Sequence, residues 1–253
     1  MEKKSFFAPS KLKAAIIYVL LLLIGAPLIG GLVGLIIGPS QGVDSTLVFQ
    51  SFFISTNDSK VLFAHHTALG WANLITYLLA TLAACFYLRN YLIEDILKIK
   101  ENKKKYIILF PVLVISFAAI AYGVDRLFSL FSKSSANQTT IEAVLMTSGK
   151  IPMIIATVLF APVVEELIYR KSIFEALRKL SLVSAYITSI VCFSLPHMLG
   201  GAESVGAWFI QLLPYMILGG LLCFVYHISN HNVYVSIAAH MLNNLVAVIM
   251  FLI

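Results

Sequence analysis

Two adjacent carboxylates interrupt an apolar stretch in the second half of the chain, in the sequence APVVEELIYRKSIF. Glu166 and Arg170 are four residues apart, so on a helix they share one face and form an ion pair in the favourable order. Glu165 has Tyr169 at the same spacing, which is a hydroxyl and not a cation. We therefore expect Glu165 to remain available to bind a proton or a metal ion.

Imidazole and amide groups occur in two later apolar stretches, CFSLPHML and AAHMLNNLVAV. His197 follows Pro196, which removes a backbone donor and should kink a helix beside the imidazole. His240 and Asn244 share a helical face, whereas Asn243 points about 100° away and is expected to hydrogen-bond to another helix. Taken singly, each of these residues is also explained by ordinary packing or hydration.

The three stretches reach similar depths when they are read as membrane-spanning helices. Counted from the expected cytoplasmic ends, Glu165, His197 and Asn244 lie roughly 21 to 22 Å deep, and His240 lies one turn lower. An ionisable group inside a span costs on the order of 2.5 to 3.5 kcal/mol on insertion scales, so such a cluster indicates function. A carboxylate can take a proton from water, imidazoles can orient that water or hold a metal, and an amide can stabilise an oxyanion. The set predicts hydrolysis of an amide bond in a site shielded from bulk water.

The composition places these groups in a bilayer. Of 253 residues, 60% are hydrophobic and only 12% are charged, with a mean hydropathy of +0.92. A soluble domain carries roughly 25% charged residues, so a water-soluble enzyme is excluded. At roughly 20 residues per span, the chain has room for six to eight spans and no large extramembrane domain. Because continuous apolar runs replace strand-like alternation, we predict an all-α polytopic transmembrane helix bundle.

The apolar runs predict about seven spans, whose ends are uncertain by several residues: 14–37, 69–88, 106–127, 151–169, 182–199, 206–226 and 233–253. An outer loop is expected at 38–68. The chain changes character near residue 150, because the earlier spans are almost purely apolar and the later ones contain Glu, His, Asn and Arg. We therefore predict accessory helices over 1–149 and a catalytic core over 150–253.

The basic residues predict the orientation of the bundle. If the N-terminus is cytoplasmic, 14 of the 18 Lys and Arg residues lie on the cytoplasmic side, Lys3 and Lys4 among them. The other four are Lys60, Arg126, Lys133 and Lys150. The positive-inside rule then places the N-terminus in the cytoplasm and, for seven spans, the C-terminus outside. The net charge of +6 thus reflects orientation and contact with anionic lipid of the cell membrane, and gives no support to nucleic-acid binding.

Three motifs occur in order on three of the last four predicted spans: EELIYR fits EExxxR, FSLPH fits FxxxH and HMLNN fits HxxxN. In these motifs the chain resembles the CPBP family of intramembrane endopeptidases, also called the CAAX-protease or Abi family. The matching region is about 150–253. The resemblance implies that Glu165 activates water, with Glu166 and Arg170 completing that motif.

The resemblance also implies roles for the imidazoles and the amide. His197 would share in water activation or metal binding, and His240 and Asn244 would position or polarise the scissile carbonyl. The family is described both as metalloproteases and as metal-independent glutamate proteases, so the question of a cofactor stays open. The candidate ligands for a divalent metal such as zinc are Glu165, His197 and His240.

The implied substrate is a membrane-associated, lipidated or prenylated peptide or protein, with roles in prenyl-protein processing, peptide maturation or bacteriocin immunity. Many family members have Phe before the Arg and Gly after it, where this chain has Tyr169 and Lys171, and Pro196 before the His is less usual. These departures bear on substrate fit, since no catalytic group is lost.

Two other functions remain open. Buried Glu and His chains also serve transporters and proton-coupled channels, which predict inverted repeats and paired broken helices that the sequence does not display. A non-catalytic membrane scaffold that regulates a partner protein is the third interpretation.

Overall fold

The computed structural model describes residues 8–130 and 135–253, and these are almost entirely helical, with no strand among them. Lys3, Lys4 and Lys133, which were counted for the orientation, lie outside the described residues. In this part of the chain six helices are long and apolar enough to cross a membrane, and Leu182–Met198 is a shorter apolar helix. The prediction of an all-α polytopic helix bundle is confirmed, and the protein is a multi-pass integral membrane protein.

The first half of the chain consists of long helices and short connecting ones. In order, they are α1 (Pro9–Leu20), the π-helical η1 (Leu21–Gly25), α2 (Ala26–Ser40), α3 (Ser45–Gln50), α4 (Ser59–Glu101), α5 (Lys103–Phe128) and α6 (Ala136–Leu145). Elements α1 to α2 form one continuous helix.

The second half begins with a continuous helix, Lys150–Leu177, which we call the carboxylate helix. Its parts are α7 (Lys150–Ile155), the π-helical η2 (Ala156–Phe160), α8 (Ala161–Glu166), the π-helical η3 (Leu167–Phe174) and α9 (Glu175–Leu177). It is followed by α10 (Leu182–Ser194), the 3₁₀-helical η4 (Leu195–Met198), α11 (Val205–Ile228) and α12 (Val233–Leu252).

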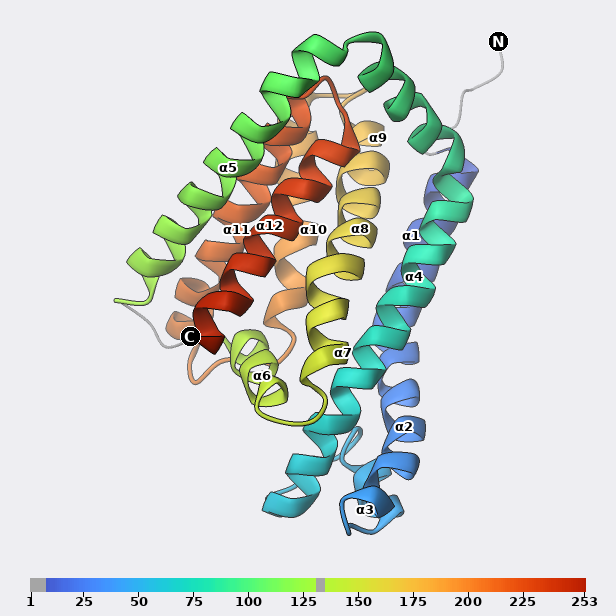
Figure 1. Ribbon diagram of the computed structural model, residues 1–253, viewed down its shortest axis with the longest axis vertical. Coiled ribbons are helices and arrows are strands. Elements are labelled where there is room, and N and C mark those ends of the chain that lie inside the picture. The colour runs from blue at the N-terminus through green and yellow to red at the C-terminus, as the bar shows by residue number, and fades with distance from the viewer. Residues whose placement is uncertain (1–7, 131–134) are drawn as a thin grey trace.

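The long helices run up and down the bundle in alternation (Figure 1). The α4–α5 turn, α9 and the α11–α12 turn lie at the upper end of the view, which is the end that the sequence predicts to be cytoplasmic. α3 and the turn between α6 and α7 lie at the lower end. This alternation agrees with the predicted order of crossings, while the side on which the N-terminus lies stays a prediction.

α4 has 43 residues and extends beyond both ends of the predicted second span, 69–88. Its first turns fall in the expected outer loop, where Asp58 caps the helix by accepting hydrogen bonds from the backbone N–H groups of Lys60 and Val61. Ala64 and Ala68 then pack with Val48 of α3 in a small buried cluster. The expected loop 38–68 is therefore partly helical, because its polar residues form caps and its small residues form a packing face.

α4 and the start of the carboxylate helix approach each other closely at two glycines. A Cβ atom added at Gly70 would overlap the carbonyl oxygen of Gly149, and one added at Gly149 would lie 2.7 Å from the carbonyl oxygen of Thr67. Because glycine has no side chain, the two backbones can approach each other closely here, as they do at small residues in other membrane proteins. These glycines therefore set the distance between α4 and the helix that carries the carboxylates.

Gly70→Ala is expected to lower the free energy of unfolding by about 1 to 3 kcal/mol, because the added methyl group meets a carbonyl oxygen that cannot turn away. Thermal or detergent-induced unfolding of the purified protein measures the change. The matched control is Gly123→Ala on α5, where an added Cβ meets nothing within 4 Å. Equal stability of both variants would contradict the close packing of α4 against the carboxylate helix.

Candidate active site

The carboxylate helix departs from α-helical geometry on both sides of its two carboxylates, in η2 and η3. Within η2 the backbone N–H of Ala161 donates to the carbonyl of Ala156, five residues earlier. The same spacing pairs the carbonyl of Thr157 with Pro162, which has no N–H. Asn244 of α12 supplies the missing donor, with its Nδ2 atom 2.8 Å from the Thr157 oxygen. π-helical turns of this kind occur frequently at functional sites.

Glu165 lies in the interior of the bundle and faces an imidazole. It is 4% exposed, and its Oε2 atom lies 3.9 Å from Nε2 of His240, which is 3% exposed. The hydroxyl of Tyr77, on α4, is within hydrogen-bonding reach of the same carboxyl group. The 3.9 Å between Oε2 of Glu165 and Nε2 of His240 is longer than a hydrogen bond. It would allow the oxygen atom of one bridging water molecule to contact both side chains.

Glu166 lies on the other side of the same imidazole. Its Oε1 atom is 3.3 Å from Nδ1 of His240, and its Oε2 atom is 3.3 Å from Nε of Arg170. The side chains of Glu166 and Arg170 are fully buried, and the two atoms are not aligned for a hydrogen bond, so charge holds this pair together. The predicted i, i+4 pair is thus present, and its carboxylate contacts the imidazole that faces Glu165.

The predicted depth of His240 is wrong. Counting from about Leu180 placed it one turn below Glu165, but the structure places it against both carboxylates. The two helices are level where Oε1 of Glu175 lies 3.0 Å from Nδ1 of His231. From that point nine or ten residues of each helix lead to His240 and Glu165, so Glu175 at the start of α9, and not Leu180, was the correct reference.

His197 lies apart from the carboxylates. Pro196 is the second residue of the 3₁₀-helical η4, which confirms a local break in the helix. The imidazole of His197 stacks on the ring of Tyr215 in α11, with centroids 4.5 Å apart and planes at 6°. The ring of Phe193 contacts His197 at 5.1 Å and His240 at 5.7 Å. The structure therefore brings Glu165, His240 and the Glu166 pair together, and the ring of Phe193 contacts both His240 and His197.

The Asn244 amide takes part in two hydrogen bonds, with Thr157 and with Asn243. Its Nδ2 atom is used by the Thr157 carbonyl, and its Oδ1 atom accepts a hydrogen bond from Asn243 at 3.2 Å. Among the described residues, Asn243 thus bonds within its own helix and not across to another one. One N–H of the Asn244 amide takes no part in these two contacts.

The predicted metal ligands do not converge. Zinc in a catalytic site takes three protein ligands. Across residues 8–130 and 135–253, no group of three or more His, Cys, Asp or Glu side chains is placed to hold a metal ion. Of the candidates, Glu165 and His240 are neighbours, whereas His197 stacks on Tyr215. This arrangement does not fit the predicted ligand set, and zinc stays a prediction from the sequence.

Sequence reasoning missed the contribution of α4 to the site. Tyr77 lies within reach of Glu165, and Thr81, one turn later, donates its hydroxyl to the Phe160 carbonyl at 3.0 Å. The available signal was the i, i+4 spacing of these two hydroxyls in a span that is otherwise almost purely apolar.

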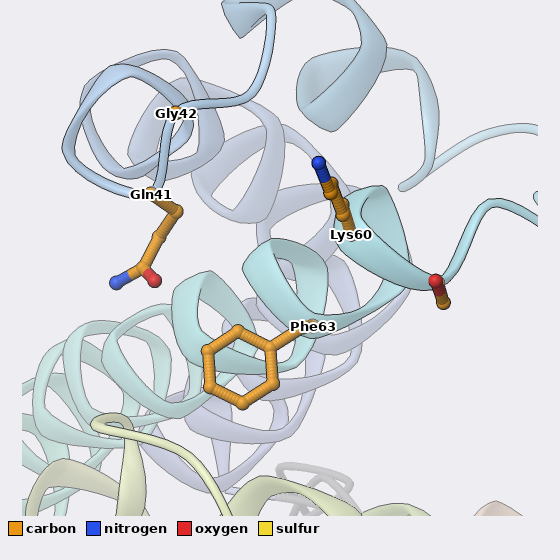
Figure 2. Close-up of a pocket in the computed structure, with 5 residues that line it drawn as sticks. Gln41, Gly42, Lys60 and Phe63 are labelled. Carbon is orange, nitrogen blue, oxygen red and sulfur yellow. The ribbon is translucent and has the colours of Figure 1, made fainter.

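A surface pocket of about 420 Å³ lies elsewhere, at the end of α2 and the start of α4 (Figure 2). Its lining consists of Gln41, Gly42, Ser59, Lys60 and Phe63. It contains neither an acid nor an imidazole, so it does not compete with the buried carboxylates as a hydrolytic site.

The comparison with protein families agrees with the motifs. Residues 147–246 match the family model Rce1-like, described as type II CAAX prenyl endopeptidase Rce1-like. The searches of curated proteins and of solved structures gave no match. The matched range contains every acid, imidazole and amide that the sequence nominates and excludes α4 with Tyr77. This match confirms the resemblance to the CPBP family and supports a CAAX-type intramembrane protease.

Proposed function

We propose, from the Rce1-like domain at residues 147–246, that this protein hydrolyses a peptide bond of a prenylated or otherwise lipidated peptide inside the membrane. One observation carries the proposal: an imidazole lies between two buried carboxylates within that domain. His240 directs Nδ1 to Glu166 and Nε2 to Glu165. Burial gives such charged groups electrostatic strength that they would not have in water.

Glu165 is the general base of the proposed reaction. It takes a proton from a water molecule while the water oxygen attacks the scissile carbonyl carbon. It then returns this proton to the leaving nitrogen as the C–N bond breaks. Water held between Glu165 and His240 would contact both groups, which are 3.9 Å apart.

Glu166 and Arg170 orient His240 in this proposal. With its Nδ1–H directed to Glu166, the ring presents Nε2 to the space beside Glu165. In the protonated ring, Nε2–H can donate to the oxyanion that forms on the attacked carbonyl. The resemblance implies a role in water activation for His197, whose imidazole stacks on Tyr215. The remaining N–H of Asn244 is the amide donor proposed for the carbonyl.

The lipid-facing surroundings suit a lipidated substrate. The site lies in a bundle whose outer helical faces expose many large apolar side chains. A prenyl chain partitions into such a bilayer at about 0.8 kcal/mol per buried CH₂ group, which concentrates the attached peptide at the membrane. The proposed reaction uses no metal ion, because the predicted ligands do not converge among the described residues.

Purified protein in lipid nanodiscs is expected to cleave a peptide that ends in a prenylated Cys-a-a-X sequence. Because of membrane partitioning, kcat/KM should exceed that for the unprenylated peptide by at least about 10-fold. Mass spectrometry identifies the products, and a parallel reaction contains a chelator. Unchanged cleavage with chelator supports the metal-free scheme, and loss of activity that zinc restores would replace it with the zinc site. Cleavage of neither peptide would contradict the proposed substrate class.

A further inference from the structure

Asp95, near the end of α4, is a fully buried carboxylate outside the Rce1-like domain. Both of its oxygens lie 2.7 Å from Nζ of Lys171, and Oδ1 also lies 2.8 Å from Nζ of Lys98. Lys171 is only 5% exposed, whereas Lys98 is 32% exposed. Asp95 and Lys171 therefore form a desolvated ion pair between α4 and the carboxylate helix, which we call the Asp95–Lys171 clamp.

The same carboxylate also holds the start of α12. Oδ2 of Asp95 accepts a hydrogen bond from the backbone N–H of Val233 at 3.0 Å, and the Asp95 carbonyl accepts one from Nδ2 of Asn232 at 2.8 Å. Val233 is the first residue of α12, so Asp95 supplies an acceptor to a helix N-terminus, where a negative charge is favourable. Lys171 adds a hydrogen bond to the carbonyl of His231 at 3.3 Å.

The turn before α12 has an uncommon backbone conformation. Asn230 and His231 both have positive φ values, 61° and 55°. Such values are uncommon for residues other than Gly and persist where the surrounding structure imposes them. The contacts of the clamp to His231, Asn232 and Val233 contribute to that constraint. They act together with the hydrogen bond from the His231 N–H to the Tyr226 carbonyl and the contact of His231 with Glu175.

The clamp joins the two helices that carry the reacting groups. Lys171 lies six residues after Glu165 on the carboxylate helix, and Val233 lies seven residues before His240 on α12. A shift of α12 along the carboxylate helix would separate His240 from both carboxylates. A misplacement of 1 Å in a catalytic constellation can cost about 100-fold in rate.

We propose that Asp95 and Lys171 are positioning residues, which fix the register of α12 against the carboxylate helix and so place His240 between Glu165 and Glu166. This inference rests on the proposed function for its kinetic consequence. Its structural consequence, the position of the α12 N-terminus, stands without that function.

The test compares two double variants of the full-length protein in nanodiscs. Asp95→Leu/Lys171→Met removes the clamp without leaving one buried charge unpaired. Glu94→Leu/Lys100→Met makes the same substitutions at exposed positions of the same helix end. The clamp variant is expected to lose at least about 10-fold in kcat on the prenylated peptide, with KM within about two-fold, because only the reacting groups move. The control should keep the kinetic constants of the unsubstituted protein.

Hydrogen–deuterium exchange gives a readout that does not depend on peptidase activity. The first amides of α12 should exchange at least about 10-fold faster in the clamp variant and at an unchanged rate in the control. If the unsubstituted protein cleaves no prenylated peptide, the proposed function fails while this arm still tests the clamp. If the double variant does not fold, Asp95→Asn is measured instead, and it should lower kcat and speed the same exchange. Unchanged exchange, or an unchanged kcat in an active protein, would overturn the inference.

Discussion

Glu165→Gln is expected to lower kcat for peptide cleavage by about 10²- to 10⁴-fold, the range that a general base contributes. Gln has the size of Glu but cannot take a proton from water. Glu166 is paired with the guanidinium of Arg170, whereas Glu165 faces the imidazole of His240. The substitution of Glu165 should therefore leave the folded membrane protein intact. Initial rates in nanodiscs, with thermal unfolding of the same samples, measure both effects.

Glu94→Gln is the matched control for this prediction, since Glu94 is exposed on α4. It should keep the unsubstituted rate. A Glu165→Gln protein that cleaves at the unsubstituted rate would remove Glu165 from the mechanism, and one that no longer folds would show that the carboxylate has a structural role.

The Glu166–Arg170 pair is expected to dominate the stability of the site. Arg170→Met should lower the free energy of unfolding by about 3 to 5 kcal/mol, because it leaves the fully buried carboxylate of Glu166 without its cation. The double variant Glu166→Gln/Arg170→Met should recover most of this loss, since no unpaired charge remains. It should stay poorly active, because the partner of His240 Nδ1 is changed.

Arg178→Met provides a contrasting ion pair on the same helix. Arg178 pairs with Glu175 at 2.8 Å, but its side chain is 42% exposed. An exposed pair contributes about 0 to 1 kcal/mol, so this substitution should change stability little. Detergent-induced unfolding measures both losses of stability. If they are equal, the loss in Arg170→Met does not come from leaving the buried Glu166 carboxylate without its cation.

The fold was predictable where hydrophobicity alone decides it. Continuous apolar runs gave the helical class and the approximate positions of the spans. The extent of α4 was not predictable in this way, because its two ends are polar: Asp58 caps one end and Asp95 is buried near the other. A hydropathy count treats both residues as loop signals, although the structure satisfies each with hydrogen bonds.

The candidate site was predictable where one helix determines it. The Glu166–Arg170 pair follows from four-residue spacing, and its geometry is local. The level of His240 depends on how two helices meet. The contact between Glu175 and His231 marks where they are level, and counting from expected helix ends cannot supply this point.

Two further groups lay beyond sequence reasoning for a related reason. Tyr77 reaches Glu165 from a helix that is distant in sequence, and Asn244 faces a carbonyl that is freed only because a π-helical turn precedes Pro162. Both contacts depend on packing between helices. Lys171 was visible only as a departure from the family motif, and its partner Asp95 lies 76 residues earlier.

The most direct measurement of the central claim is mass spectrometry of a prenylated Cys-a-a-X peptide incubated in nanodiscs with the unsubstituted protein and, separately, with Glu165→Gln. If Glu165 activates the attacking water, the unsubstituted protein releases the residues that follow the prenylated Cys as a product of simple hydrolysis. The Glu165→Gln protein then releases at least about 100-fold less of this product in the same time. Equal release by both proteins, or an intact peptide with both, would contradict the claim.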